Sequence, residues 1–191
     1  MTEERDLAPE ITSRRSVTTW KPDKLDSKTW TLLLEAARRA PSSWNNQPAR
    51  YVVVDAKASL QRVYQGLHRA NYWAEKAPAL LIQVARPADD DVVGSQPYYL
   101  FDCGLAMMSL LLQAQRLDID SHMMIGFDEE EVRQAISLPP DYRIVVIVAL
   151  GYHAESNVAV KLQETRRRIT GQHKRYAIDH LVSRQKWGET W

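Results

Sequence analysis

The sequence has few of the features that mark secreted, membrane-bound or metal-binding proteins. Its single cysteine, Cys103, excludes an intramolecular disulfide and any metal site built only from cysteines. The longest wholly apolar run extends only from Ile144 to Leu150, whereas a membrane helix needs ~20 residues. The charged start, Met1 to Asp6, lacks the apolar stretch of a signal peptide. We therefore expect a cytoplasmic protein that does not enter a membrane.

Charge and glycine content narrow the function classes further. The 25 basic and 24 acidic residues leave a net charge of +1, so no overall field attracts nucleic acid or a membrane surface. Only seven glycines are present, and the glycine-rich motifs of dinucleotide, Walker and α/β-hydrolase sites do not occur. The five histidines lack metal-ligand spacing and are expected to be surface or structural residues. The sequence thus predicts no metal site.

Apolar runs and helix signals alternate along the chain. Asp26 is a good N-cap, Pro9 can open a helix, and Asp128 precedes three glutamates that suit the positive end of a helix. Helices are expected at 9–14, 27–40, 58–67, 98–117 and from 129 onward, with buried strands at 51–54, 80–85, 121–125 and 142–152 and a loop at 86–97. Strands that alternate with helices predict one domain over residues 1–191, with three layers around a sheet.

Two segments are expected to need packing partners beyond their own residues. The helix at 98–117 is apolar almost all round, which indicates burial by other elements or by another subunit. Gly104 and Ala106 permit close approach of another helix. Residues 153–191 are basic and polar, with too few apolar side chains for a core of their own. We expect this tail to lie on the domain or on a partner subunit.

Two polar constellations, at Arg14–Ser16 and Pro41–Pro48, are candidates for ligand binding. Two arginines beside Ser16 suit a phosphate, although a solvated surface pair is the alternative. The hydroxyls and amides of the loop between Pro41 and Pro48 suit the edge of a planar heterocycle, and the alternative is a turn that satisfies its own backbone. The arginines of the basic tail are compatible with nucleic acid, with solvent, or with a ligand phosphate.

In order along the chain, several short motifs resemble the nitroreductase family of FMN-dependent oxidoreductases over roughly Ile11 to Tyr152. The motifs are Arg-Arg-Ser at 14–16, Pro-Ser-Ser-x-Asn-x-Gln-Pro at 41–48, Asn71 before Ala77-Pro78, Asp-x-Gly at 102–104, Ile125-Gly126-Phe127-Asp128, and a last strand that ends Leu-Gly-Tyr. The resemblance implies an α+β fold with three α-β-α layers, a central mixed sheet and an intertwined homodimer with FMN at its interface. It also implies that residues 153–191 form an arm on the partner subunit.

The resemblance also implies roles for particular residues. Arg14 and Ser16, with Arg15 beside them, would hold the phosphate and ribityl side of FMN. Asn71 would contact the pyrimidine edge, and the backbone amides of Ile125 and Gly126 would face N5 and O4 of the flavin. The remaining implied FMN contacts are Thr18, the loop residues Pro41, Ser42, Ser43, Asn45 and Gln47 from the partner subunit, and an arginine of the tail such as Arg166 or Arg168.

The implied reaction is a ping-pong reduction in which the flavin carries the chemistry and no protein side chain is catalytic. NAD(P)H would reduce bound FMN, and a small acceptor such as a nitroaromatic or quinone would then take two electrons. Thr18 stands where many members carry Lys or Arg, which leaves the flavin potential open. The alternatives are a flavin-binding storage or sensor protein and a specialised flavin reaction on the same fold, such as dehalogenation or flavin cleavage.

Overall fold

The computed structural model describes residues 6–154 and 175–189. The chain divides into two units, Met1–Glu155 and Ser156–Trp191. The described part of the second unit contains one short helix, α7 (Ile178–Leu181), whose apolar side chains are exposed. Arg166 and Arg168 lie outside the described residues, and the packing of an arm on a partner subunit stays a prediction.

A four-stranded sheet forms the centre of the first unit. Its strands are β1 (Ala49–Val54), β2 (Ala79–Ala85), β5 (Ile119–Met124) and β6 (Arg143–Tyr152), in the spatial order β1-β2-β6-β5. All three pairings are antiparallel. A mixed sheet, with parallel and antiparallel pairing, was expected. In the described residues, the parallel pairing is an isolated bridge between Ser16 and Ser121.

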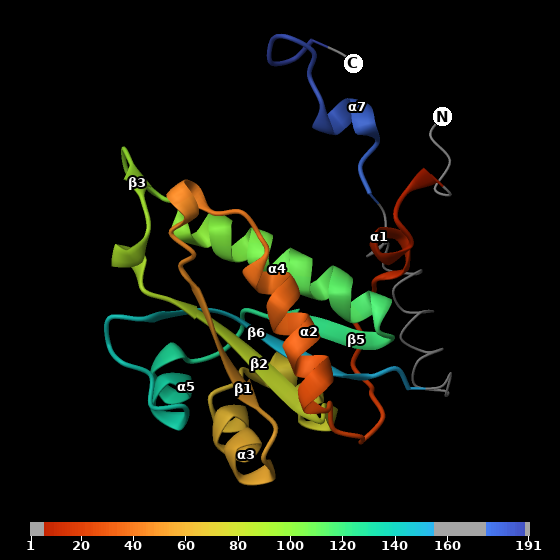
Figure 1. Cartoon of the computed structure of the whole chain (residues 1–191), viewed down its shortest axis with the longest axis vertical. Helices are drawn as coiled ribbons and strands as arrows, with labels where there is room; N and C mark the ends of the chain where they lie inside the picture. Colours follow the sequence, from red (N-terminus) through yellow and green to blue (C-terminus); the bar gives the residue numbers. More distant parts are fainter. Residues whose placement is uncertain (1–5, 155–174, 190–191) are drawn as a thin grey trace. The chain divides into compact units, whose positions relative to one another are not determined.

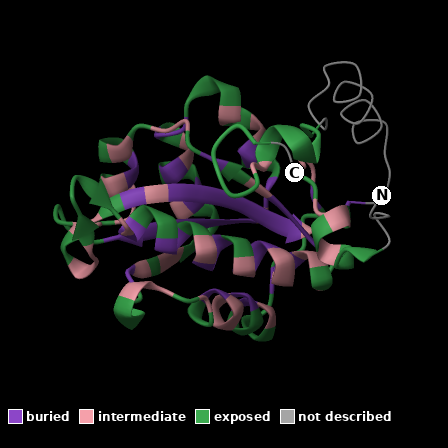
Figure 2. Ribbon diagram, turned by 90° about the horizontal axis from the view of Figure 1, so that it is seen from above, coloured by how far each residue is buried: buried purple, intermediate pink, exposed green. Residues whose placement is uncertain are grey.

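Helices cover both faces of this sheet, so the expected three-layer α-β-α arrangement is confirmed (Figure 1). On one face, α2 (Ser27–Arg38) and α4 (Tyr99–Arg116) pack Leu33 and Leu110 against Leu81 and Val148. On the other face lie α3 (Lys57–Gln65), the 3-10 helix η3 (Arg69–Lys76) and α5 (Glu129–Ala135). The buried residues gather along the central strands, because β2 and β6 are covered from both sides (Figure 2).

Local signals place these helices as expected. The side chain of Asp26 accepts a hydrogen bond from the Thr29 N–H at 2.7 Å, and the short helix α1 (Pro9–Ser13) begins at its proline. Asp128 caps α5 by accepting from the Glu131 N–H at 2.9 Å. Each cap satisfies a backbone donor that the first helical turn leaves free.

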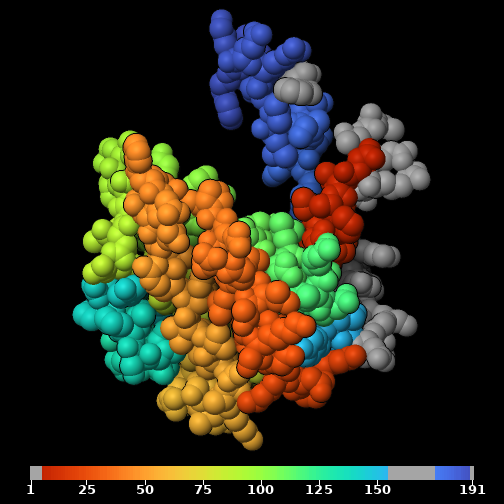
Figure 3. Space-filling view, viewed as in Figure 1, coloured from red at the N-terminus to blue at the C-terminus, as the bar shows by residue number. Residues whose placement is uncertain are grey.

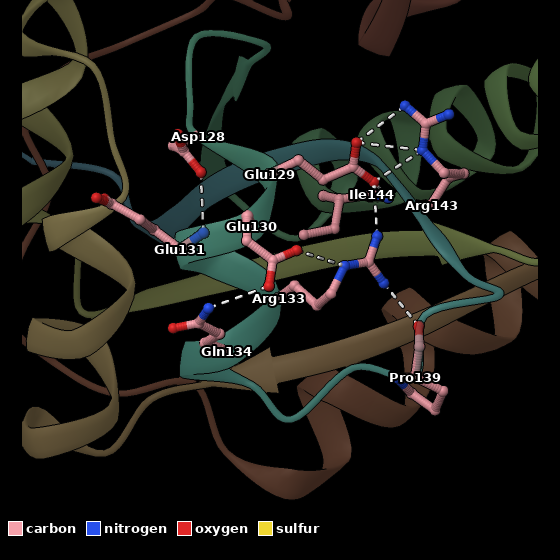
Figure 4. Close-up of polar contacts among 9 residues, drawn as sticks. All are labelled: Asp128, Glu129, Glu130, Glu131, Arg133, Gln134, Pro139, Arg143 and Ile144. Carbon is pink, nitrogen blue, oxygen red and sulfur yellow. Dashed lines mark hydrogen bonds and ion pairs between the residues drawn. The ribbon is translucent and has the colours of Figure 1, made fainter.

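The first residue of α5 joins this helix to β6. The Glu129 carboxylate accepts hydrogen bonds from the Arg143 guanidinium at 2.9 Å, from Arg133 at 3.1 Å and from the Ile144 N–H at 3.0 Å (Figure 4). The hydrogen bonds from Arg143 hold the pKa of Glu129 below its usual value. Charge-assisted bonds therefore tie the start of the central strand to the helix layer.

Two sequence expectations differ from the structure. The strand at 51–54 was expected to be buried, but β1 is an edge strand and only Val54 is fully buried, because β1 has a single neighbouring strand. Residues 86–97 were expected to be a loop. They contain a 3-10 turn, η4 (Pro87–Asp89), and a hairpin of β3 (Val92–Val93) and β4 (Gln96–Pro97). Gly94 supplies the positive φ that the tight turn of this hairpin needs.

The helix α4 is buried on one side only. Cys103 is fully buried against the sheet, as expected for a small apolar residue, and burial raises the pKa of its thiol to about 12. On the other side Leu100, Phe101 and Met108 are exposed, Phe101 by 62%. A methyl group added at Gly104 would have no described neighbour within 4 Å. Close approach at Gly104 is therefore not made within the described part of this chain.

None of the described helices combines the length and apolar character that crossing a membrane requires. Residues 6–154 and 175–189 also contain no cluster of histidine, cysteine or carboxylate side chains suited to a metal ion.

Candidate functional site

The segment Arg14–Thr18 lies along the free edge of β5. Ser16 forms the parallel bridge with Ser121, and the imidazole Nδ1 of His122 lies 2.7 Å from the carbonyl oxygen of Val17. The guanidinium of Arg15 donates to the Thr12 and Arg14 carbonyls at the end of α1. The sheet edge thus carries two arginines and a hydroxyl at one place.

A second group of predicted residues meets at the end of β5. The side-chain amide of Asn71, in η3, donates to the carbonyl oxygen of Gly126 at 2.8 Å. A methyl group added at Gly126 would lie 3.0 Å from that amide nitrogen. Ile125 is 84% exposed, and among the described residues no partner accepts from the N–H groups of Ile125 or Gly126. Two backbone donors and one amide side chain are therefore available together.

These two groups form one strip along the edge of β5. Ser121 and Gly126 are five residues apart, and a strand rises ~3.3 Å per residue, so the strip is roughly 16 Å long. It has cationic side chains and a hydroxyl at one end, and backbone donors with an amide at the other. Such a donor set suits an extended ligand with an anion at one end and a planar polar group at the other.

The loop Pro41–Pro48 lies elsewhere, between α2 and the start of β1. Because β1 and β5 are opposite edges of the four-stranded sheet, three strand spacings of ~4.8 Å separate the loop from the strip by roughly 14 Å. The structure brings Ser42, Ser43, Asn45 and Gln47 together with one another. It does not bring them to Asn71 or Ser16 within one chain.

The backbone of this loop is strained. Trp44, Asn45 and Gln47 all have positive φ, at 44°, 63° and 51°. For residues with a side chain this left-handed region costs roughly 1–2 kcal/mol each, and asparagine tolerates it better than tryptophan does. Conformations of this kind persist only where the surroundings determine them, and they concentrate at functional sites.

Carboxylates from the neighbouring segments hold the loop. The Ser43 N–H donates to Asp102 at 2.7 Å, and the Ser43 hydroxyl donates to Asp91 at 2.5 Å. The side-chain amide of Asn46 donates to Asp90 at 3.0 Å. In the space-filling view, the orange chain before β1 lies against the yellow-green chain of residues 86–97 (Figure 3).

The carboxylate of Asp102 is 4% exposed, in the first turn of α4. Burial raises the pKa of Asp102, and the negative charges of Asp90 and Asp91 act in the same direction, whereas the hydrogen bond from the Ser43 N–H opposes them. The loop is therefore anchored by a carboxyl group that is costly to ionise at this place.

Known proteins resemble this chain in sequence and in fold. A family model described as the nitroreductase family matches residues 11–97 and 65–152. The chain belongs to the nitroreductase family. It is 30% identical over 173 residues to an NADH dehydrogenase of Thermus thermophilus, covering 74% of this chain and 84% of that protein. It is 29% identical over 175 residues to the protein DrgA of Synechocystis, and the match covers 76% of this chain and 83% of that protein.

A solved structure supports the same fold for this nitroreductase-family chain. It is described as an oxidoreductase containing FMN, and it covers 98% of this chain and 96% of its own with a TM-score of 0.77. At 22% sequence identity this likeness shows the fold alone.

Sequence reasoning missed several residues that shape the site of this nitroreductase-family protein. Asp90, Asp91 and Asp102 were visible as acidic residues, but no local signal connects them to a loop some 44 to 59 positions earlier. His122 and Trp73 were also missed as partners; their rings stack with centroids 4.0 Å apart. Among the aromatic residues beside the predicted site residues, Trp44 is 91% exposed and Tyr72 is exposed, whereas Trp73 is half-buried.

Proposed function

We propose that the protein is an FMN-dependent oxidoreductase that takes electrons from NAD(P)H and passes them to a small acceptor such as a nitroaromatic or a quinone. Membership of the nitroreductase family supports this proposal, as does the name NADH dehydrogenase of the Thermus relative. Bound FMN would accept a hydride and release electrons, chemistry that no side chain of the protein supplies. The cytoplasmic location expected from the sequence stays a prediction.

The residues along β5 fit FMN. Arg14 and Arg15 offer cations for its phosphate, and Ser16 offers a hydroxyl beside them. At the other end of the strip, the N–H groups of Ile125 and Gly126, which have no acceptor within residues 6–154 and 175–189, suit acceptors on the ring, and the Asn71 side chain lies next to them. Thr18 lies half-buried in the same N-terminal segment and contributes no cation. The protein's part is to hold and orient the cofactor.

The separation of the loop from the strip carries the proposal that the site is shared between two copies. A ring contacted by both Asn71 and Ser43 of one chain would have to reach from one edge of the sheet to the other. A second copy can bring its own loop to the strip from outside. The exposed apolar side of α4, with Leu100, Phe101 and Met108, offers a surface for that copy.

Absorption spectroscopy of the purified protein tests the activity. We expect a yellow protein, or a colourless one that turns yellow with added FMN, and bleaching by NADH or NADPH without oxygen. A protein that neither carries nor binds FMN would contradict the proposal. A bound flavin that resists both donors would favour the storage or specialised-reaction alternatives.

Mixing two inactive variants tests the shared site. Arg14→Ala damages the strip and Asn45→Ala damages the loop, so each homodimer has two damaged sites. A mixed dimer has one site with both changes and one site with neither. We expect FMN binding to reappear on mixing after subunit exchange, whereas a site within one chain would recover nothing. Each variant incubated alone is the control.

A further inference from the structure

Three carboxylates, those of Asp90, Asp91 and Asp102, accept hydrogen bonds from the loop Ser42–Gln47, and the proposed function assigns them no role. We propose that Asp102 and Asp91 are positioning residues, which hold this loop in its strained, ligand-ready conformation before any ligand binds. The consequence for FMN rests on the proposed function, because Ser42, Ser43 and Asn45 are then the groups that contact the ring. The positioning of the loop by Asp102 and Asp91 does not depend on the proposed function.

Both carboxylates are connected to the start of α4. Asp102 lies in the first turn of the 18-residue helix α4, next to the fully buried Cys103. The carbonyl oxygen of Asp91 accepts from the Tyr98 N–H at 2.9 Å, at the start of that helix. The two hydrogen bonds to Ser43 therefore connect the loop to the start of α4, directly through Asp102 and indirectly through Asp91.

Within the loop, two backbone hydrogen bonds span Trp44: the Asn45 N–H donates to the Ser42 carbonyl oxygen at 3.1 Å, and the Asn46 N–H donates to the Ser43 carbonyl oxygen at 2.8 Å. The loop's internal side-chain bonds are from the Gln47 N–H to the Ser42 hydroxyl at 2.9 Å and from the Gln47 side chain to the Asn45 carbonyl at 3.1 Å. Neither involves Trp44, whose positive φ is the least favourable of the three for its side chain. These bonds within the loop do not connect it to another element. If the bonds to Ser43 are removed, the Asn46 side chain still donates to Asp90 and Asp91, but the side of the turn before Trp44 loses its contact with α4.

The structure also predicts which substitutions preserve the hydrogen bonds that position the loop. An asparagine at position 102 keeps an oxygen that accepts from the Ser43 N–H, although a neutral acceptor is weaker than a charged one. An alanine removes the acceptor altogether. Asp89 provides a matched control, because it lies in the same acidic run but pairs with Arg86 and makes no bond to the loop.

Hydrogen exchange of the FMN-free protein tests directly whether Asp102 and Asp91 position the loop. We expect the amides of Ser43 and its neighbours to exchange faster in Asp102→Ala and in Asp91→Ala than in the wild-type protein, with Asp102→Asn and Asp89→Asn close to wild type. Unchanged exchange in both alanine variants would overturn the proposal. Asp91→Ala keeps the test valid if Asp102→Ala does not fold.

Titration with FMN, followed by flavin fluorescence, tests the consequence for binding. Loss of preorganisation predicts that Asp102→Ala raises the dissociation constant about tenfold or more, while Asp102→Asn stays within about threefold of wild type. An alanine variant that exchanges faster but binds FMN normally would overturn the positioning role. Wild-type protein that binds no FMN would instead overturn the proposed function, and the exchange result would stand by itself.

Discussion

At the scale of single residues, the end of β6 leaves no room for a side chain at Gly151. A methyl group there would lie 2.7 Å from Cδ of Pro78 and 3.0 Å from Cβ of Trp20. Both neighbours belong to rigid parts of the core, where extra volume forces atoms apart. Gly151 is therefore required by packing, and its φ is not involved.

We expect Gly151→Ala to destabilise the protein by roughly 1–3 kcal/mol, the usual cost of overpacking a core. Gly151→Val adds more volume in the same space and should cost more. Urea unfolding followed by circular dichroism measures both. Equal stability of wild type and Gly151→Ala would show that Pro78 and Trp20 move aside at little cost.

A buried carboxyl group at residue 120 makes stability depend on pH. Asp120 is 8% exposed, and burial raises its pKa, although a hydrogen bond with His153 at 2.7 Å opposes this shift. The folded state thus keeps the proton to a higher pH than the unfolded state. This group's contribution is present below about pH 4 and is lost as the pH rises through the folded pKa.

The variant Asp120→Asn removes this titration while keeping the shape. We expect its unfolding free energy, relative to wild type, to rise as the pH increases from about 4 through the raised folded pKa of Asp120. Urea titrations at several pH values measure the difference. A difference that does not change with pH would show that Asp120 is not responsible.

At the scale of elements, the network around Glu129 joins α5 to the start of β6, and its pH dependence has the opposite sign. The Arg143 guanidinium lowers the pKa of Glu129, so the unfolded state takes up the proton first as the pH falls. The contribution is present above the unfolded value of about 4.3 and is lost at lower pH. The two ends of this network are 14 residues apart in sequence and in contact in space.

We expect Glu129→Gln to reduce stability by roughly 1–3 kcal/mol at neutral pH, because three donors lose a charged acceptor. Near pH 3, below the usual pKa of glutamate, the deficit should be smaller than at neutral pH, and it should vanish only below the lowered folded pKa of Glu129. Thermal unfolding at both pH values makes the comparison. A deficit of the same size at both would indicate a packing effect instead.

At the scale of the whole molecule, the first unit has a three-layer core and an exposed apolar surface. Its sheet is covered on both faces, yet α4 leaves large apolar side chains in contact with water. The same chain holds the two parts of the candidate site on opposite sheet edges. The proposed second copy would cover this surface and complete the site, and so we expect assembly and cofactor binding to be lost together.

We expect Phe101→Asp combined with Met108→Asp to give a folded monomer that no longer binds FMN, since a charge buried in an apolar interface is strongly unfavourable. Light scattering after size exclusion reports the mass, and circular dichroism reports the fold. The control is Leu32→Asp, which places one such charge at an exposed leucine of α2. A monomeric variant that still binds FMN would contradict the shared site.

Local chemistry along the chain was sufficient for most of the elements. Asp26, Asp128 and Pro9 mark helix starts through their own side chains, and the apolar run Ile144–Leu150 indicates a buried strand wherever it is placed. The order of short motifs also indicated the nitroreductase family and the candidate residues at both ends of β5. These features were readable because each depends on neighbours in sequence.

The tertiary structure alone decided what depends on distant neighbours. It makes β1 an edge strand, since strand order is not written in any one strand. It places Asp91 and Asp102 behind Ser43 and strains Trp44, through contacts that cross some 48 to 59 positions. It also puts the two halves of the candidate site on opposite edges of one sheet. The sequence by itself determined which groups are available for binding, and the packing of the sheet determined which of them can meet.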